Sequence, residues 1–293
     1  MQIQSIPFIL LMGTIFGSTL LVSRLGISQF HPTTFVGLRM LIAVSIYGLV
    51  YVLRIGNRKI PRDRNLWKHG ILFGIFGTAV PITFIISSLI YQSSGVTSLL
   101  MTTSPAMTVL IANYLLPDER LSIKKVVGVL LALGGAALLA IRGETGLPDV
   151  HQASIIGYGL ALTGILTGSV ALVFARRNLR LYHAFEVASI RMVTAMLVVV
   201  PISIMLVGVD FSHVDRIGWL SLLFTGIIGT FFGFFLEFYI VKRFGATPAV
   251  MAGYVVPIIA TLGGWLFLNE VVTLGMLGVM VMILSGITLV NQG

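Results

Sequence analysis

The sequence predicts an all-α integral membrane protein with ten transmembrane helices in two inverted five-helix repeats. Three observations lead to this fold class. Hydrophobic residues make up 57% of the 293-residue chain and charged residues only 10%, whereas a soluble domain is about 45–50% apolar. Apolar runs of about 20 residues, long enough to cross a bilayer, recur along the whole chain. The second half of the sequence repeats the motifs of the first half.

Each apolar run is expected to form a helix. Hydrocarbon offers no partner to an unpaired backbone N–H or C=O, and the runs do not show the alternation with a period of two that a barrel strand requires. We expect spans at residues 7–26, 33–53, 69–90, 96–116, 124–141, 154–174, 184–207, 217–240, 246–267 and 273–291.

The repeated motifs are in register over nearly the whole chain. Matched residues lie 151 or 152 positions apart. Such constant spacing is not expected by chance in apolar sequence, where most residues are interchangeable. The matched pairs are Gly13 and Gly164, Gly17 and Gly168, Ser18 and Ser169, His31 and His183, Arg39 and Arg191, Trp67 and Trp219, Gly77 and Gly229, Thr78 and Thr230, Pro105 and Pro257, Glu119 and Glu270, and Gly135 and Gly286.

The number of helices in each copy determines their relative orientation. Because five is odd, the second copy crosses the membrane in the opposite sense to the first. We expect the first repeat at residues 1–142, a periplasmic linker at 143–153 and the second repeat at 154–293. Inverted repeats of this kind are typical of carriers that alternate access around a site near the bilayer midplane.

The net charge of +9 is concentrated in the loops on one side of the predicted membrane. The opposite loops hold Arg142 and, at helix edges, Arg24 and Arg216, so the positive-inside rule places both termini in the cytoplasm of an inner-membrane protein. A nucleic-acid surface would interleave aromatic residues with the charge, so we expect no such partner. The clustered basic residues are Arg54, Arg58, Lys59, Arg62, Arg64, Lys68, Arg120, Lys124, Lys125, Arg176, Arg177, Arg180, Lys242 and Arg243.

The sequence contains no catalytic constellation. It has no cysteine, no His-Glu-x-x-His motif and no phosphate-binding glycine loop, and its histidines fall in loops or at predicted helix ends. We therefore expect no enzymatic activity, no metal and no cofactor. The five histidines are His31, His69, His151, His183 and His213.

Three ionisable residues lie well inside predicted spans: Arg39, Arg191 and Glu237. Such residues are costly in a bilayer and face protein or water. Because both copies keep the arginine, we expect it to lock helix ends by bonding exposed carbonyls, with a place in the substrate site as the alternative. Glu237 has no acidic counterpart, and three roles stay open: reaching the interface near Lys242, pairing with Arg191, or binding a coupling proton.

Prolines and hydroxyl groups inside the spans indicate where a cavity could form. Pro81, Pro105 and Pro257, with Pro201, each remove a helical hydrogen bond and can bend a span. We expect helix bends at the first three, and because Pro105 and Pro257 recur in both copies, we expect their bends to shape a central cavity. Polar residues near them could line it, although such hydroxyls often bond their own helix. The candidates are Ser18, Thr78, Ser104, Thr108, Ser169, Thr230, Tyr254 and Thr261.

Several motifs resemble the EamA-type, ten-helix branch of the drug/metabolite transporter superfamily. They are the glycine-rich first helix from Gly13 to Ser18, Pro32 followed by Arg39, and Pro105 followed by Glu119. In the second copy Ala184 replaces the proline that begins the helix. The resemblance implies an inner-membrane carrier of small organic solutes, often an exporter of amino acids or related metabolites, although some relatives import vitamins.

The combined observations favour a secondary transporter that works by alternating access. The few fixed charges favour neutral or zwitterionic solutes, and export is preferred over uptake of a vitamin or metabolite. A non-transporting membrane scaffold or subunit is the alternative from another class. The expected partners are a small-molecule solute and membrane lipid, while a proton as coupling ion and a homodimer stay open.

Overall fold

Every secondary-structure element that the computed structural model describes is a helix, over residues 3–115, 121–148, 154–208, 210–244 and 246–292. In the first repeat the helices are η1 (Ile3–Ser5), α1 (Ile6–Gly26), α2 (Pro32–Val52), η2 (Ile55–Asn57), α3 (Arg64–Gly74), η3 (Ile75–Ala79), α4 (Val80–Ser88), α5 (Ser94–Met101), α6 (Ser104–Leu115) and α7 (Ile123–Ile141). In the second they are α8 (Ile155–Asn178), α9 (Ala184–Val207), α10 (Arg216–Phe224), η4 (Thr225–Phe232), α11 (Gly233–Phe244), α12 (Ala246–Leu268) and α13 (Leu274–Gln292).

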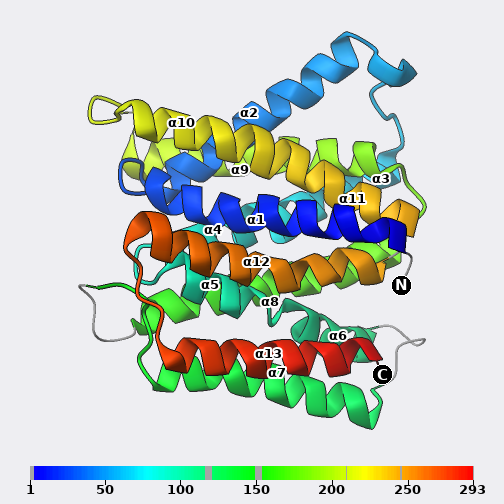
Figure 1. Cartoon of the computed structure of the whole chain (residues 1–293). Coiled ribbons are helices and arrows are strands. Elements are labelled where there is room, and N and C mark those ends of the chain that lie inside the picture. Colours follow the sequence, from blue (N-terminus) through cyan, green and yellow to red (C-terminus); the bar gives the residue numbers. More distant parts are fainter. Residues whose placement is uncertain (1–2, 116–120, 149–153, 209, 245, 293) are drawn as a thin grey trace.

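The helices confirm the predicted fold class. In the described residues, nine helices or helix runs are long and apolar enough to cross a membrane, and the apolar α13 completes ten spans. The third span comprises α3, η3 and α4, and the fourth comprises α5 and α6. The eighth comprises α10, η4 and α11. Figure 1 shows that α1 begins on the side of the bundle where α13 ends, as an even number of crossings requires.

Span limits agree with the sequence expectation to within a few residues. The third span begins at Arg64 rather than residue 69, because the Asp63 side chain accepts hydrogen bonds from the N–H groups of Asn65 and Leu66. An aspartate at this position satisfies donors that have no partner inside the helix. The polar sequence before Trp67 can therefore join the helix.

Small residues allow the closest helix contacts. At Gly128 of α7 an added Cβ would lie 2.4 Å from the Gly286 carbonyl oxygen of α13, and the reverse substitution would leave 2.5 Å. Gly13 and Gly17 of α1 approach the backbone of α12 in the same way. Such backbone contact drives association where lipid is as apolar as the side chains. Figure 1 shows α7 and α13 side by side at one end of the bundle.

The second spans of the two repeats form one of the contacts between the repeats. α2 packs against α9, and each of these helices also packs against the π-helical segment of the other repeat, α2 on η4 and α9 on η3. This arrangement buries the middle of both second spans. It also brings together residues that lie far apart in the sequence.

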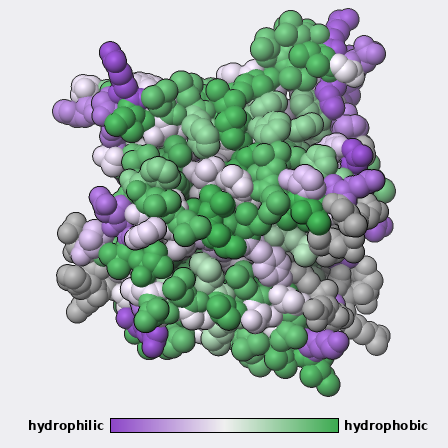
Figure 2. Space-filling view, in the orientation of Figure 1, coloured by the Kyte–Doolittle hydropathy of each residue, from purple (hydrophilic) through white to green (hydrophobic). Residues whose placement is uncertain are grey.

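The outer surface is apolar where lipid would cover it. Figure 2 shows hydrophobic side chains over the middle of the visible face and hydrophilic ones mainly toward its two edges. Large apolar side chains such as Leu130, Leu197, Leu220 and Trp265 are exposed. A surface of this kind suits a multi-pass integral membrane protein.

Candidate functional site between the repeats

Arg39 and Arg191 lie where the two repeats meet, on α2 and α9, and each is only 4% exposed. Arg39 Nε donates a hydrogen bond to Thr230 Oγ1 over 2.8 Å. Arg191 Nε donates to Thr78 Oγ1 over 2.7 Å. Each bond connects one repeat with the other, and the two bonds use matched atoms. We call these contacts the crossed arginine–threonine pairs.

Both threonines belong to π-helical segments, Thr78 to η3 and Thr230 to η4. A π-helix bonds residues five apart, which shifts side chains out of α-helical register and is frequent at functional sites. The Thr230 hydroxyl follows this spacing, because it donates to the Thr225 carbonyl over 2.9 Å. Its oxygen can then accept from Arg39. The π segments thus present each threonine to the arginine of the opposite repeat.

The arginines therefore have different partners from those we expected. Their Nε atoms bond hydroxyl groups in the middle of a span, whereas we expected carbonyls at a helix terminus. A further bond runs from Arg191 Nη2 to the Gly77 carbonyl over 3.2 Å, also inside η3. The sequence could not predict this, because π segments have no reliable local signature.

The surroundings of the two arginines differ. The Arg191 guanidinium lies 4.5 Å from the ring centre of Phe73 and 4.6 Å from that of Phe234. Glu237, which is partly buried, lies within electrostatic reach of Arg191. Arg39 instead donates to Ser23 Oγ over 3.3 Å. This electrostatic interaction favours pairing with Arg191, but the three roles of Glu237 stay predictions, and the Lys242 side chain lies outside the described residues.

The fourth span is interrupted near the middle of its length. α5 ends at Met101 and α6 begins at Ser104, with Pro105 directly after the break. The hydroxyl groups of Thr102 and Thr103 donate to the carbonyls of residues 98 and 100, each over 2.7 Å. Discontinuous helices of this kind form the substrate sites of many inverted-repeat carriers.

The other prolines leave their spans continuous. α12 runs through Pro257 and α9 runs through Pro201. Pro81 is the second residue of α4, at the point where η3 ends. Of the three predicted bends, the one at Pro105 therefore coincides with a break.

The predicted cavity residues take part in several different contacts among the described residues. Thr78 and Thr230 hold the arginines. Ser169 Oγ donates to the Ser104 carbonyl over 3.3 Å, which joins the fourth and sixth spans, and Ser18 bonds the Ile15 carbonyl of its own helix. The Tyr254 hydroxyl lies 3.5 Å from that of Thr288. The hydroxyls of Thr108 and Thr261 are buried and have no hydrogen-bond partner among the described residues.

Sequence reasoning missed the role of Glu270. Its carboxylate is buried at the start of α5, where Oε1 accepts from the Ser94 N–H over 2.8 Å and Oε2 accepts from the Ser94 hydroxyl over 2.8 Å. A carboxylate is favourable at a helix N-terminus because free N–H groups and the helix dipole point there. The one indication in the sequence was that Glu119 and Glu270 occupy matched positions in the two repeats. Glu119 itself lies outside the described residues.

Comparison with known proteins gives matches along nearly the whole chain. The family model of the EamA-like transporter family matches residues 4–141 and again residues 155–292. A Bacillus subtilis protein named uncharacterized transporter YoaV is 27% identical over 279 residues, 93% of this chain and 91% of that protein. An Archaeoglobus fulgidus protein named uncharacterized transporter is 26% identical over 282 residues, 94% and 95% of the two chains. One solved crystal structure has the same fold, with a TM-score of 0.67 at 23% identity over 96% of this chain and 94% of that one.

Proposed function

The chain belongs to the EamA-like transporter family, and on that premise we propose that it is a secondary carrier that works by alternating access. It moves small organic metabolites across the cytoplasmic membrane. The proposed solutes are neutral or zwitterionic, with amino acids as the first candidates, and the proposed direction is export.

The crossed arginine–threonine pairs are the observation that best supports this mechanism. Alternating access requires two halves that rock against each other without separating. The pairs join the halves at two matched points, Arg39 with Thr230 and Arg191 with Thr78. Both points lie in buried surroundings where water cannot compete for the bonds. They are suited to act as the joint between the moving halves.

The polar groups inside the bundle support the proposed solute class. Arg39 and Arg191 are buried and bonded to threonines of the opposite repeat, so their charges are not exposed to a solute. Near the break in the fourth span the side chains are mainly hydroxyls and apolar groups, such as Ser104, Met101 and Ile85. These groups suit a solute with no net charge.

The basic loops support an orientation with both termini in the cytoplasm. Lys and Arg in short loops favour the cytoplasmic side, and the α2–α3 connection carries Arg54, Arg58 and Arg62. A reporter inserted at Arg62 should therefore report cytoplasm, and one at Leu147 the opposite side. The same location for both reporters would contradict the inverted orientation.

A metabolite screen followed by reconstitution tests the function. Strains that overproduce the protein should lower the intracellular level of at least one amino acid, and the purified protein in proteoliposomes should exchange that amino acid in counterflow. Thr230→Val should slow exchange, because it removes one inter-repeat bond. Ser45→Ala is the matched control, since Ser45 is exposed and bonds only the Leu41 carbonyl of its own helix.

The other outcomes of this test are distinct. Accumulation of the solute in overproducing cells would reverse the proposed direction and indicate an uptake carrier. A protein that exchanges no solute and copurifies with a stoichiometric partner would instead be a membrane scaffold. Either result would replace the proposed export function.

A further inference from the structure

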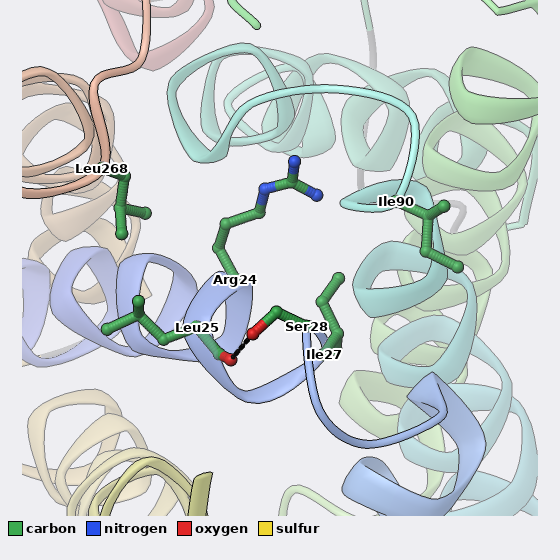
Figure 3. A pocket seen from close by; sticks show the side chains of 6 residues that line it. All are labelled: Arg24, Leu25, Ile27, Ser28, Ile90 and Leu268. Carbon is green, nitrogen blue, oxygen red and sulfur yellow. Dashed lines mark hydrogen bonds between the residues drawn. The ribbon is translucent and has the colours of Figure 1, made fainter. Parts of the chain in front are cut away.

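An open pocket of about 360 Å³ lies at the end of α1 that faces away from the basic loops. It is bounded by α1, the connection between α4 and α5, and the last residues of α12. Figure 3 shows the Arg24 side chain extending into the space between these elements. The residues that line the pocket are Arg24, Leu25, Ile27, Ser28, Ile90 and Leu268.

Arg24 is anchored by one hydrogen bond, and its other N–H groups can still bind a ligand. Its Nη1 atom donates to the Leu89 carbonyl, the one hydrogen bond of this side chain among the described residues. A guanidinium group has five N–H donors, so most of the fork stays available. Glu270 lies within electrostatic reach and offsets part of the charge of Arg24, while its oxygens accept hydrogen bonds from Ser94 and Gly95. A fixed arginine fork is well suited to bind a carboxylate through two parallel hydrogen bonds.

The rest of the pocket wall is mainly apolar. Leu25, Ile27, Ile90 and Leu268 supply aliphatic side chains, and the Ser28 hydroxyl is engaged with the Leu25 carbonyl over 2.7 Å. One cation in an aliphatic wall matches a ligand with one carboxylate and an apolar substituent. A volume of this size is also within the range of about 300–1,000 Å³ that small-molecule sites occupy.

The matched positions of the second repeat do not reproduce this pocket. The motifs of α1 match at a shift of 151 residues, which takes Arg24 to Ala175, next to Arg176 and Arg177, and the later shift of 152 residues takes Ile90 to Lys242. The opposite end of the bundle is therefore polycationic, whereas the pocket combines a single cation with apolar neighbours. A feature of the shared scaffold would be expected in both repeats, so the asymmetry argues for a specific role.

We propose that this pocket binds the carboxylate end of a small solute with an apolar side chain, and that Arg24 is the carboxylate-binding residue. The inference rests on the proposed function, since it names the class of solute that the carrier handles on this side. A phospholipid phosphate offers the same anionic oxygens. The test below therefore separates a solute from a lipid.

Equilibrium binding to the full-length protein in phosphatidylcholine nanodiscs tests the proposal. Radiolabelled leucine and 4-methylpentanoate should bind, and leucinamide, which lacks the carboxylate, should bind at least about tenfold more weakly, as expected for loss of a charge-assisted hydrogen bond. Arg24→Gln should weaken binding of both carboxylates to a similar extent. Arg216→Gln is the matched control, because it removes an exposed cation on the same side and outside the pocket.

A second variant covers the case in which Arg24→Gln fails to fold. Ser28→Phe narrows the pocket and leaves the guanidinium and its bond to Leu89 intact. It should therefore also weaken the binding of both carboxylates. Unchanged affinity in the folded variants would overturn the proposal, as would failure of both carboxylates to bind the wild-type protein. Loss of solute binding in phosphatidylglycerol nanodiscs would show a lipid site and overturn it as well.

Transport measurements keep this inference separate from the proposed function. If proteoliposomes exchange leucine and the Arg24→Gln and Ser28→Phe variants bind it normally, the carrier function stands and the pocket assignment fails. If the pocket binds carboxylates as described and proteoliposomes exchange no solute, the pocket assignment stands and the carrier function fails.

Discussion

The fourth and ninth spans occupy equivalent places in the two repeats, yet only the fourth is broken. Pro105 and Pro257 are matched in register, and each removes one backbone hydrogen bond. The helix stops and restarts before Pro105 but runs through Pro257 from Ala246 to Leu268. The proline alone therefore does not determine whether a span is interrupted.

The difference follows from the neighbouring side chains. Thr102 and Thr103 supply hydroxyls that bond backbone carbonyls on the α5 side of the break. These carbonyls also accept the backbone N–H groups of Thr102 and Thr103, and a threonine hydroxyl that bonds the preceding turn in this way bends a helix. The matched residues are Tyr254, whose hydroxyl lies at Thr288 instead, and the apolar Val255. The repeats thus share a proline, and the first repeat alone has the two threonines that bond the preceding turn.

For the two arginines, the repeats share the main contact and differ in the surrounding side chains. Their threonine bonds are the same in both repeats, but the second repeat adds aromatic rings and Glu237 around Arg191. The shared part is the proposed joint between the halves. The unshared parts, the broken fourth span and the acid beside Arg191, are where the two repeats can differ in function.

The largest expected effect comes from removing Arg191. Arg191→Leu breaks the bonds to Thr78 and Gly77 and leaves Glu237 without its cation, so it should lower the free energy of unfolding by about 3–5 kcal/mol. Arg39→Leu should cost about 2 kcal/mol, because it leaves no unpaired acid. Unfolding by dodecyl sulfate in mixed micelles, followed by circular dichroism, measures both. Normal stability and abundance with abolished transport would instead place the arginines in the substrate site.

Glu270 gives the next largest effect. Glu270→Ala leaves the buried N–H groups of Ser94 and Gly95 without their acceptor, which should cost about 2–3 kcal/mol. The same unfolding measurement tests this. Glu144→Ala is the control, since Glu144 is on the same side of the bundle and its described hydrogen bond to Tyr158 uses the backbone carbonyl. Equal losses for the two variants would show that Glu270 does not stabilise α5.

The broken span should respond more weakly. Thr102→Val and Thr103→Val each remove one hydroxyl–carbonyl bond and should cost about 1 kcal/mol apiece. Tyr254→Phe removes the matched hydroxyl of the continuous span and should cost less than about 0.5 kcal/mol. A thermal melt of the detergent-solubilised protein compares the three. Equal effects would contradict the assignment of the break to its threonines.

The smallest effect is a pH dependence that both repeats should share. The N–H of Asn65, followed by that of Leu66, lowers the pKa of Asp63, and the N–H of Gly218 lowers the pKa of Asp215. Because each folded-state pKa is depressed, the stabilisation is present above the ordinary aspartate pKa of about 3.9 and is lost as the pH falls through the folded-state value.

Asparagine also caps helices but does not titrate, which makes it the test substitution for Asp63 and Asp215. The double variant should keep most of its stability near neutral pH. Its melting temperature should fall less than that of the wild type when the pH is lowered from about 5 to about 3. Each single variant should account for roughly half of the change. If the double variant kept the full acid dependence of the wild type, that dependence would come from other carboxylates.

The sequence predicted the spans well because hydrocarbon imposes one requirement on every segment. Backbone groups must be satisfied within a helix, so apolar run length alone locates the crossings. Limits differed where a polar cap extended a helix into the loop, as Asp63 does before α3. The duplication was visible because Arg39, Thr78 and their counterparts stand out against interchangeable apolar residues.

The site was harder to predict, because it depends on contacts between distant spans. The sequence indicated Arg39, Arg191, Thr78 and Thr230 as separate candidates, but it did not show that they bond in crossed pairs. That pairing depends on the π segments, which rotate the threonines toward the opposite repeat. The capping role of Glu270 likewise depends on a contact with residues more than one hundred and seventy positions earlier.

A double-mutant cycle tests the crossed arginine–threonine pairs most directly. Combining Arg39→Lys with Thr230→Val, and Arg191→Lys with Thr78→Val, should give coupling energies of about 1–2 kcal/mol in unfolding experiments, since bonded partners are not additive. The mismatched combinations, Arg39→Lys with Thr78→Val and Arg191→Lys with Thr230→Val, should be additive within about 0.5 kcal/mol. Additivity in the matched pairs, or equal coupling in the mismatched ones, would contradict the joint between the repeats.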